Sequence, residues 1–404
     1  MLGWHRLWLV GAGLVVVLLV LRLCSLQRFG TEAPHSVSRP EHIQLADDLD
    51  RASLDLALQR SLDYVRRLPP DRLFPLGDRQ ITASTLRQTL ETFQHLLKQA
   101  PTAAALHAAL HEQFDFVQAS GRQGRGDVLF TGYYEPVLSG SLVPTERFTY
   151  PLYMPPPDLI HIDLARFRPE WRGERLVAQY RNGQIVPYLT RREIDVEAKL
   201  QGRGLELVWL PDIVDAFFLH IQGSGHIRLP NGQDMRVHYA ASNGHPYRSI
   251  GKLLLDEARL SPSAITMQQL RQYLRTHPGD RDRVLNHNPR YIFFRPVDEG
   301  PIGRRGFALV PGRSIATDPR LFPASGLAFI QTQQPVLNAS HEVIGWQPLT
   351  RFVFNHDAGS AIKGPGRVDL YWGSGIPAEA AAGRLKHEGH LFFLLKRALN
   401  PAPP

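Results

Sequence analysis

The sequence predicts a protein with a helical amino-terminal part and a mainly β body of barrel or sandwich type. Leucine side chains recur with helical spacing between about residues 50 and 120. Beyond Gly126, short runs rich in β-branched and aromatic residues alternate with Gly, Pro, Asn and Asp turns. The chain has 404 residues, 43% of them hydrophobic, so it can bury the cores of two or three domains.

The basic charge balance predicts an acidic partner. The formal net charge is +8, for which nucleic acid, an anionic membrane surface and an acidic polysaccharide are candidates. Basic residues are dispersed in short pairs such as Arg66-Arg67 and Arg304-Arg305, whereas nucleic-acid-binding proteins concentrate them in a stripe or tail. We therefore expect no nucleic acid partner.

Residues 1–24 are predicted to form a signal or membrane-anchor segment. Leu7–Leu21 is a run of 15 apolar or glycine residues, which as a helix would span about 22 Å of a hydrocarbon core about 30 Å thick. The run fits a signal peptide, and Arg22 and Leu23 could extend it into an uncleaved anchor. Either alternative exports the body of the protein, and residues 25–49 are predicted to be a flexible linker.

Cys24 is the single cysteine of the chain, so the folded body has no disulfide and no thiolate metal ligand. Its place directly after the apolar run resembles the lipidated cysteine of bacterial lipoproteins. That pattern expects a small residue where this chain has Leu23. Lipidation of Cys24 and burial of a plain cysteine in the anchor are both open at this point.

The segment from about Asp50 to Ser120 predicts three helices. One stripe contains Leu54, Leu58, Leu62, Val65 and Leu68, a second contains Leu86, Leu90, Phe93 and Leu97, and a third helix covers 103–114 after Pro101-Thr102. Their expected role is packing on the β body. After a glycine-rich break at 121–126, Val128–Leu138 predicts the first strand, Ile227–Val237 a hairpin, and Ser261–Pro278 a further helix.

The run from Asn355 to Gly375 holds two aspartates among several glycines. Such glycines indicate tight turns and close backbone approach, as a binding cleft requires. Asp357 is expected at a turn, and Asp369 in a strand, on the face opposite Val368 and Leu370. Apolar and aromatic surroundings raise a carboxyl pKa, so Asp369 is a candidate general acid; the alternative is a turn cap or a pair with Arg367.

Two further segments carry candidate binding groups. Gln222, Ser224, Asn243 and Tyr247 bring amides, a hydroxyl and a ring next to glycines, a mixture that suits sugar recognition, although turn glycines alone would explain it. The neighbouring histidines do not have the spacing of a helical metal site, so we expect no metal. In Thr131-Gly132-Tyr133-Tyr134-Glu135, one tyrosine can face a groove while the other packs, and Glu135 is either a second carboxylate or a salt-bridge partner.

Taken together, these segments resemble the membrane-bound lytic murein transglycosylase A family. The residues that carry the resemblance are Phe130–Pro136, Phe218–Gly225, Tyr239–Gly244, Asn288–Phe294, Pro311–Pro319 and Asp357–Gly375, in family order. The last two also resemble the 3D domain, whose three aspartates fall at Asp318, Asp357 and Asp369. One departure is Ala358, where the family tends to have Thr.

The resemblance implies a double-psi β-barrel with a second, barrel-like β domain inserted into it, and a substrate groove between the two. The expected boundaries are 50–138 for the helices and first strand, 139–300 for the inserted domain and 301–397 for the rest of the barrel. The amino-terminal segments 1–24 and 25–49 precede them.

The resemblance also implies a reaction and a set of site residues. Asp369 would protonate the glycosidic oxygen between N-acetylmuramic acid and N-acetylglucosamine and then act as base, leaving a 1,6-anhydro end. Asp357 and Asp318 would support it. The expected substrate-binding residues are Thr131, Gly132, Tyr133, Tyr134, Glu135, Gln222, Ser224, Asn243, Lys363, Tyr371 and Trp372. No cofactor is expected.

The expected partners are peptidoglycan glycan strands, a membrane through the amino-terminal segment, and other cell-wall enzymes, with the chain itself a monomer. The expected location is periplasm-facing in a Gram-negative bacterium, at the outer membrane with a lipidated Cys24 and at the inner membrane without. Alternatives are a non-catalytic peptidoglycan-binding module and a muramidase that uses Glu135 with Asp369. An aspartic peptidase is disfavoured, because Asp357-Ala358-Gly359 occurs once and lacks the usual hydroxyl.

Overall fold

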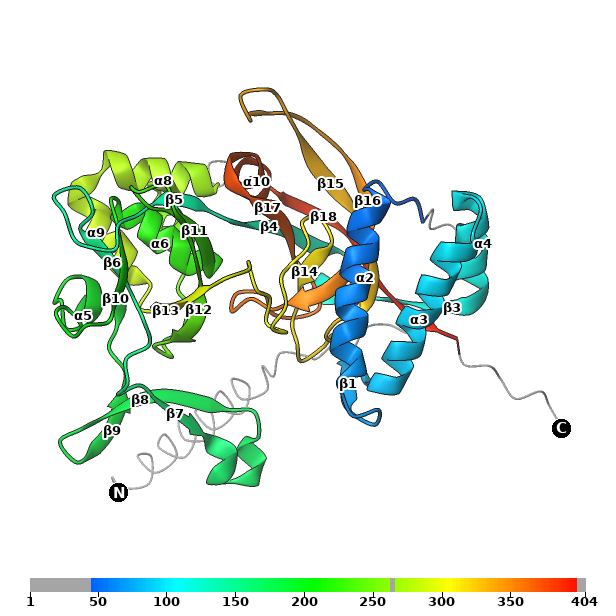
Figure 1. The fold of residues 1–404 in the computed structure, drawn as a ribbon, viewed down its shortest axis with the longest axis horizontal. Coiled ribbons are helices and arrows are strands. Elements are labelled where there is room, and N and C mark those ends of the chain that lie inside the picture. The colour runs from blue at the N-terminus through cyan, green and yellow to red at the C-terminus, as the bar shows by residue number, and fades with distance from the viewer. Residues whose placement is uncertain (1–44, 262–265, 398–404) are drawn as a thin grey trace, which may run out of the picture. The chain divides into compact units, whose positions relative to one another are not determined.

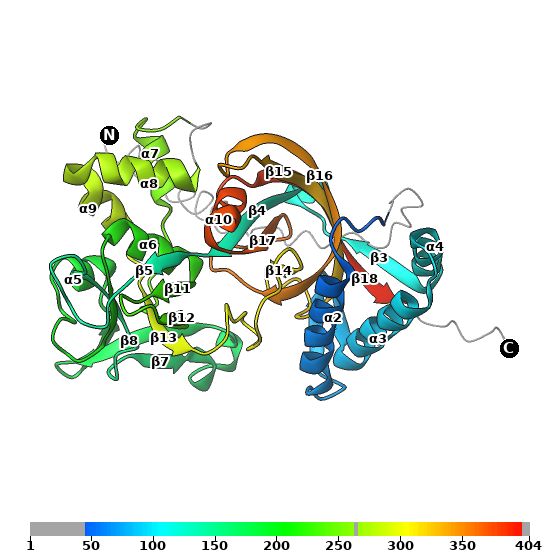
Figure 2. The same ribbon diagram turned by 45° about the horizontal axis from the view of Figure 1, so that its top comes forward.

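Six strands close into a barrel, in the order β15-β16-β14-β17-β4-β18 with β18 pairing back to β15. The β17–β4 and β14–β16 pairs are parallel and the other pairs of the ring are antiparallel. A further strand, β3, extends the sheet beyond β18. The bounds are β3 Phe114–Gln118, β4 Val128–Glu135, β14 Ser314–Ala316, β15 Leu327–Leu337, β16 Val343–Asp357, β17 Arg367–Ser374 and β18 Lys386–Lys396. The ring of strands is visible in Figure 2.

The computed structural model describes residues 45–261 and 266–397, all within one compact unit. The predicted amino-terminal anchor and Cys24 lie outside the described residues. Within the described part of the chain, none of the helices has the length and apolarity needed to cross a membrane.

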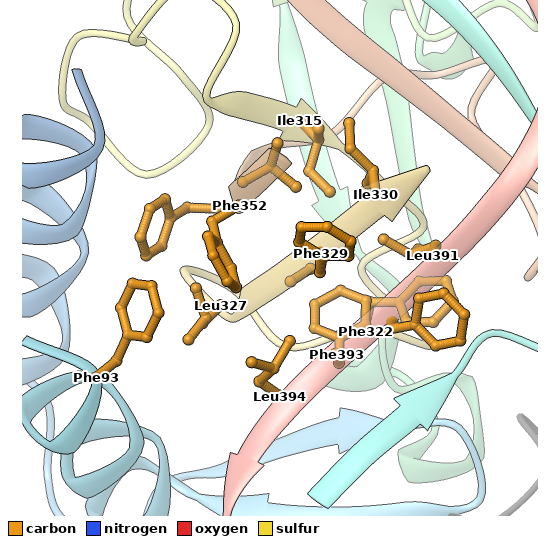
Figure 3. Close-up of a cluster of buried hydrophobic side chains, with 14 of the residues drawn as sticks. Phe93, Ile315, Phe322, Leu327, Phe329, Ile330, Phe352, Leu391, Phe393 and Leu394 are labelled. Atoms are coloured by element: carbon orange, nitrogen blue, oxygen red, sulfur yellow. The ribbon is translucent and has the colours of Figure 1, made fainter. Parts of the chain in front are cut away.

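The three amino-terminal helices are α2 Arg51–Arg66, α3 Ala83–Gln99 and α4 Ala103–Gln113. The predicted stripes are confirmed for α2 and α3: Leu54, Leu58, Leu62 and Val65 of α2 and Leu86, Leu90, Phe93 and Leu97 of α3 are buried. Asp50 and Thr82 cap the two helices by accepting from backbone N–H groups three residues later. The ring centroids of Phe93 in α3 and Phe352 in β16 lie 5.0 Å apart, so the helices and the barrel share one core (Figure 3).

Part of the region predicted as helical is β structure. The short hairpin β1 Leu73–Leu76 and β2 Arg79–Thr82 separates α2 from α3. The third helix ends at Gln113, because Phe114, Phe116 and Val117 are buried in β3 against β18. Pairing of β3 with β18 therefore sets the end of α4.

Among the described residues, the segment between β4 and β14 contains smaller sheets and five α-helices. Its strands are β5 Val137–Ser139, β6 Tyr150–Tyr153, β7 Ile160–Asp163, β8 Arg175–Arg181, β9 Gln184–Pro187, β10 Glu206–Leu210, β11 Ser224–Arg228, β12 Asp234–Ser242 and β13 Ile292–Val297. Its α-helices are α5 Arg191–Asp195, α6 Ile213–Gln222, α7 Ile250–Asp256, α8 Met267–Thr276 and α9 Pro278–His287 (Figure 1). A last helix, α10 Gly375–Ala382, follows β17.

These strands form three sheets rather than one closed ring in the described residues. The sheets are β13-β12-β11-β5, β10-β6 and β7-β8-β9. An isolated bridge between Ser141 and Trp209 connects the first two, and Leu152, Val208 and Ile227 fill a core between them. The inserted segment is thus less regular than the barrel-like domain that was expected.

The predicted hairpin is confirmed as β11–β12. The helix predicted for 261–278 corresponds to α8, which begins at Met267. Residues 262–265 lie outside the described part of the chain. Helix α6 was not predicted, although its signals are present in the sequence. Asp212 caps its first turn, and Gly223 ends it with φ of 80°.

Candidate active site

Asp369 lies in the middle of β17, as the alternation predicts. Its neighbours Val368 and Leu370 are fully buried on the other face of the strand. The parallel register sets Asp369 opposite Thr131 of β4, and the Thr131 hydroxyl donates a hydrogen bond of 2.7 Å to Oδ1 of Asp369. Within the described residues this is the only hydrogen bond to the carboxyl, so Oδ2 remains open to a ligand.

Burial and, to a smaller extent, the nearby charge of Asp357 together raise the pKa of Asp369 to about 6. The Thr131 hydrogen bond and the charge of Arg367 oppose this increase. Arg367 donates a weak bond of 3.5 Å to the Thr131 hydroxyl rather than pairing with the carboxylate. Near neutral pH both protonation states of Asp369 are therefore accessible, as a group that gives and takes a proton requires.

Asp357 ends β16 and has both carboxylate oxygens engaged. Oδ2 accepts from the Tyr133 hydroxyl at 3.1 Å, and Oδ1 accepts from the backbone N–H of Arg304 at 2.9 Å. Burial raises the pKa of Asp357, while these bonds and the backbone N–H of Ala358 oppose the rise. Asp357 is thus held in place by the protein, whereas Asp369 keeps one oxygen uncommitted.

A cavity of about 610 Å³ lies over the two aspartates, within the size range of ligand sites. Barrel residues supply one wall and residues of the inserted segment supply the other. The predicted site residues that line it are Tyr133, Gln222, Ser224, Asp357, Lys363 and Asp369. These residues come from β4, α6, β11, β16, β17 and the loop between β16 and β17, so the cavity brings together segments that the sequence analysis identified.

Asp318 lies outside the cavity lining and is fully buried. Its carboxylate binds the Arg320 guanidinium at 2.6 Å and accepts from the backbone N–H of Gly364 at 2.9 Å. Although burial acts in the opposite direction, hydrogen bonds from Arg320 and Gly364 lower the pKa of Asp318. Asp318 thereby fixes the loop that presents Lys363 to the cavity.

Glu135 forms a salt bridge, the second of the two alternatives. It is fully buried and does not line the cavity. Its Oε2 accepts from Arg236 of β12 at 2.9 Å and from the Ser374 hydroxyl at 2.7 Å. Glu135 therefore connects the barrel to the inserted segment.

The other predicted binding residues do not line the cavity. The Asn243 amide donates to the backbone oxygens of Leu189 and Pro289, and its Oδ1 accepts from the backbone N–H of Tyr291. Tyr134 is buried, and its hydroxyl accepts from Arg271. Tyr371 packs 5.3 Å from the Tyr133 ring, and Trp372 lies against Gly132.

The cavity is also lined by residues outside the set of expected site residues, one of which, Tyr247, belongs to the mixture of polar and aromatic groups noted in the sequence. The inserted segment contributes Arg191, His220, His238, Tyr239, Tyr247 and Arg290. Arg191 is buried and donates to Nδ1 of His220, whose pKa burial holds well below its ordinary value. His220, Tyr239 and Arg290 lie in segments that carry the family resemblance, so a sequence signal existed for these three residues. Across the described ranges no group of three or more His, Cys, Asp or Glu side chains is arranged to hold a metal ion.

Comparisons with known proteins agree with this arrangement. Residues 129–295 match the MltA specific insert domain, and residues 313–395 match the 3D domain. Membrane-bound lytic murein transglycosylase A of Escherichia coli is 30% identical over 283 residues, which is 69% of each chain.

Solved structures extend the likeness to the fold. The membrane-bound lytic murein transglycosylase of Agrobacterium tumefaciens is 34% identical with a TM-score of 0.72, over 86% of this chain and 93% of that one. E. coli MltA with bound chitohexaose, 24% identical, has the same fold with a TM-score of 0.67 over 91% of this chain and 96% of that one. The chain belongs to the membrane-bound lytic murein transglycosylase A family, with the MltA insert and 3D domains.

Proposed function

We propose that this chain cleaves the glycan strands of peptidoglycan as a lytic transglycosylase, without consuming water. The observation that carries the proposal is the single uncommitted carboxyl at the cavity. Asp369 has a pKa raised to about 6 and one oxygen free of hydrogen bonds within the described residues. Asp357, the other carboxyl of the cavity, has both oxygens occupied.

In the proposed reaction, protonated Asp369 donates its proton to the glycosidic oxygen between N-acetylmuramic acid and N-acetylglucosamine. The bond from C1 of the muramic residue to that oxygen breaks. Asp369, now a carboxylate, takes the proton of the C6 hydroxyl, and the C6 oxygen bonds to C1. The products are a 1,6-anhydromuramic end and a free hydroxyl on N-acetylglucosamine.

One carboxyl is sufficient because the nucleophile belongs to the substrate. A hydrolysing glycosidase needs a second carboxylate, at about 5 Å for retention or about 6.5 to 9.5 Å for inversion of configuration. An intramolecular hydroxyl held close to C1 makes activation of a separate water unnecessary. Glu135 is not suited to the role of the second carboxylate, because its salt bridge to Arg236 holds it away from the cavity.

We assign substrate contact to Tyr133, Gln222, Ser224 and Lys363, all of which line the cavity. Asp357 is proposed to position Tyr133, and Asp318 to position the loop of Lys363. For the predicted binding residues outside the lining we propose positioning roles as well. These residues are Thr131, Gly132, Tyr134, Glu135, Asn243, Tyr371 and Trp372.

The proposal includes the domain plan and the location. The helices and first strand would occupy 50–138, the inserted domain 139–300 and the remainder of a double-psi barrel 301–397. The glycan would lie in the groove between the barrel and the inserted domain. The chain would act as a monomer, exported and attached to a membrane through residues 1–24, with Cys24 as the lipidation position. Other cell-wall enzymes are its proposed protein partners.

Digestion of purified sacculi tests the reaction. Muropeptides released by the protein are analysed by mass spectrometry, where anhydro ends are lighter by one water than hydrolysed ends. We expect anhydro ends from the natural protein and none from Asp369→Asn, which should still bind sacculi. Reducing ends would instead assign a muramidase, and binding without products a non-catalytic module. An active Asp369→Asn variant would move the chemistry to another residue.

A further inference from the structure

Arg290 is a positively charged residue of the cavity wall without an acidic partner in the part of the chain that the structure describes. It lies shortly before β13, on the wall that the inserted segment supplies. Among the described residues, the Tyr239 hydroxyl is the only titratable group whose charge acts on the pKa of Arg290. Arg191 of the same wall, by contrast, forms a 3.2 Å salt bridge with Asp195. Arg290 is therefore available to an anion from outside the protein.

Most of the hydrogen-bonding capacity of the Arg290 guanidinium is unused. A guanidinium has several N–H donors, and within the described residues it makes one hydrogen bond, from Nη1 to the backbone oxygen of His245 at 3.3 Å. None of its nitrogens is both sealed from solvent and unpaired, so the remaining donors face space that a ligand can enter. Burial lowers the pKa of Arg290, and a bound anion would offset this cost of burial.

The backbone on both sides of Arg290 is fixed by hydrogen bonds. Arg191 donates from Nη2 to the backbone oxygen of Arg290 at 2.8 Å. The Asn243 amide donates to the backbone oxygen of Pro289 at 2.8 Å, and its Oδ1 accepts from the backbone N–H of Tyr291 at 2.9 Å. A side chain on a fixed backbone loses less conformational entropy when it binds a ligand. The positioning role proposed for Asn243 thus applies to Arg290.

The proposed substrate supplies anions of one kind, which are carboxylates. Each N-acetylmuramic acid bears a lactyl carboxyl, which is free in peptide-free strands and bound as an amide to the stem peptide elsewhere. The stem peptide brings carboxylates of its own, whereas N-acetylglucosamine is neutral. A guanidinium matches a carboxylate with two parallel N–H···O bonds. Because Arg290 and Asp369 line one cavity, a strand held at Asp369 shares that cavity with Arg290.

We propose that Arg290 binds a carboxylate of the muramic acid substituent, and that this contact makes the chain prefer acidic peptidoglycan strands to neutral glycans. The inference rests on the proposed function, because it assumes a peptidoglycan strand in the cavity. Arg304 and Lys363 of the barrel wall are exposed, so water and salt screen their charges more strongly. The partly buried Arg290 is therefore the cation that contributes most to the discrimination.

Binding measurements on the full chain test the proposal. All proteins carry Asp369→Asn, so that strands are bound without being cleaved, and are kept in detergent micelles. The ligands are glycan oligosaccharides of equal length prepared from sacculi, either peptide-free or peptide-bearing. Each is used before and after its carboxyls are converted to methylamides. Calorimetric titration at about 0.15 M salt, which screens exposed charges, gives the ratio of the Kd of the methylamide to the Kd of the acid.

We expect a ratio of about ten or more for the Asp369→Asn protein with at least one of the two glycans, as for hydrogen bonds to a charged group. Adding Arg290→Gln should abolish this preference, and adding Arg290→Lys should reduce it. Arg79→Gln removes an exposed charge of β2 outside the cavity lining and should leave the preference unchanged. Preference for the peptide-free acid identifies the lactyl carboxyl, and preference for the peptide-bearing acid alone identifies the stem peptide.

No binding, no preference in the Asp369→Asn protein, or a preference that is undiminished by Arg290→Gln or Arg290→Lys would overturn the proposal. An equal loss of affinity for acids and methylamides in a folded Arg290→Gln protein would also overturn it, since that outcome assigns Arg290 a structural role. Where Arg290→Gln does not fold, Arg290→Lys gives the decision. Anhydro ends released from sacculi by the natural protein report separately on the proposed reaction, which fails if the chain binds with this preference and releases none.

Discussion

The Thr131 hydroxyl donates a 2.7 Å hydrogen bond to Oδ1 of Asp369 across the parallel pair of β4 and β17. This bond stabilises the carboxylate, whereas burial favours the neutral acid. The pKa of Asp369 reflects the balance of the two. Thr131, which precedes the inserted segment in the sequence, therefore lowers the pKa of Asp369, which follows that segment.

Thr131→Val should shift the pH profile of cleavage to higher pH. The valine removes the hydrogen bond to the carboxylate, so the pKa of Asp369 rises above its value of about 6. The general acid must be protonated, and the alkaline limb of kcat/KM for anhydro-muropeptide release follows that pKa. Thr131→Ser keeps the hydroxyl and is the matched control. Equal alkaline limbs in the valine and serine variants would contradict the link.

Asp369→Asn should raise the thermal stability of the folded protein at neutral pH while abolishing cleavage. A pKa raised from the ordinary 3.8 to about 6 implies a cost of ionisation in the folded state, up to about 3 kcal/mol at about 1.4 kcal/mol for each pH unit. The asparagine avoids this cost. Because the folded pKa is raised, stability of the natural protein falls as pH increases from 3.8 to about 6 and the cost is constant above that.

Thermal unfolding at pH 7.5 and below pH 4 measures this effect, since the advantage of Asp369→Asn should vanish at the lower pH. Asp318→Asn is the opposite control. The pKa of Asp318 is lowered in the fold, so its carboxylate stabilises the protein above its unfolded pKa and the contribution is lost as pH falls. Asp318→Asn should therefore lower the free energy of unfolding by about 1.5–3 kcal/mol at neutral pH, the usual range for hydrogen bonds to charged groups. A destabilised Asp369→Asn at pH 7.5 would contradict the raised pKa.

The sequence predicted the parts whose signals are local. Helical stripes identified α2 and α3, and alternation around Asp369 identified β17 and its buried neighbours. Segment order and resemblance identified Tyr133, Asp357 and Lys363, which the cavity brings together. The closed ring depends on pairing between β4 and strands some 240 residues later, and no single-strand pattern encodes such pairing. For the same reason Asn243 and Glu135 resembled binding residues, because only the fold shows their buried partners.

Gly132→Ala should destabilise the barrel and reduce cleavage. A Cβ at this position would lie 2.7 Å from Cα of Ala382 and 2.7 Å from the Trp372 ring. Either α10 or Trp372 must move, and such overpacking typically costs about 1–3 kcal/mol. Because Gly132 adjoins Thr131, the shift should also weaken the bond to Asp369. Gly345→Ala is the control, since a Cβ there meets no atom within 4 Å, and equal melting temperatures would contradict the steric account.

Arg236→Ala should be more destabilising than Glu135→Gln, although the two residues form one salt bridge. The Glu135 side chain is 1% exposed and that of Arg236 is 33% exposed. Removing the arginine leaves a buried carboxylate without its cation, which typically costs about 3–5 kcal/mol. Removing the charge of Glu135 leaves an arginine that can still reach water, so the cost should be smaller. The Ser374 hydroxyl bond can persist to a glutamine oxygen.

The double variant Glu135→Gln with Arg236→Ala should recover part of the loss, because the buried charge is then absent. Denaturant unfolding of the four proteins gives the coupling energy, and additive losses would show that the pair does not interact. Glu135→Gln should also still release anhydro ends from sacculi. A change to reducing ends, or loss of all products in a folded Glu135→Gln protein, would bring Glu135 into the chemistry and favour the muramidase alternative. Retained anhydro products would leave Asp369 as the single acid and base, with Glu135 connecting the two parts that form its cavity.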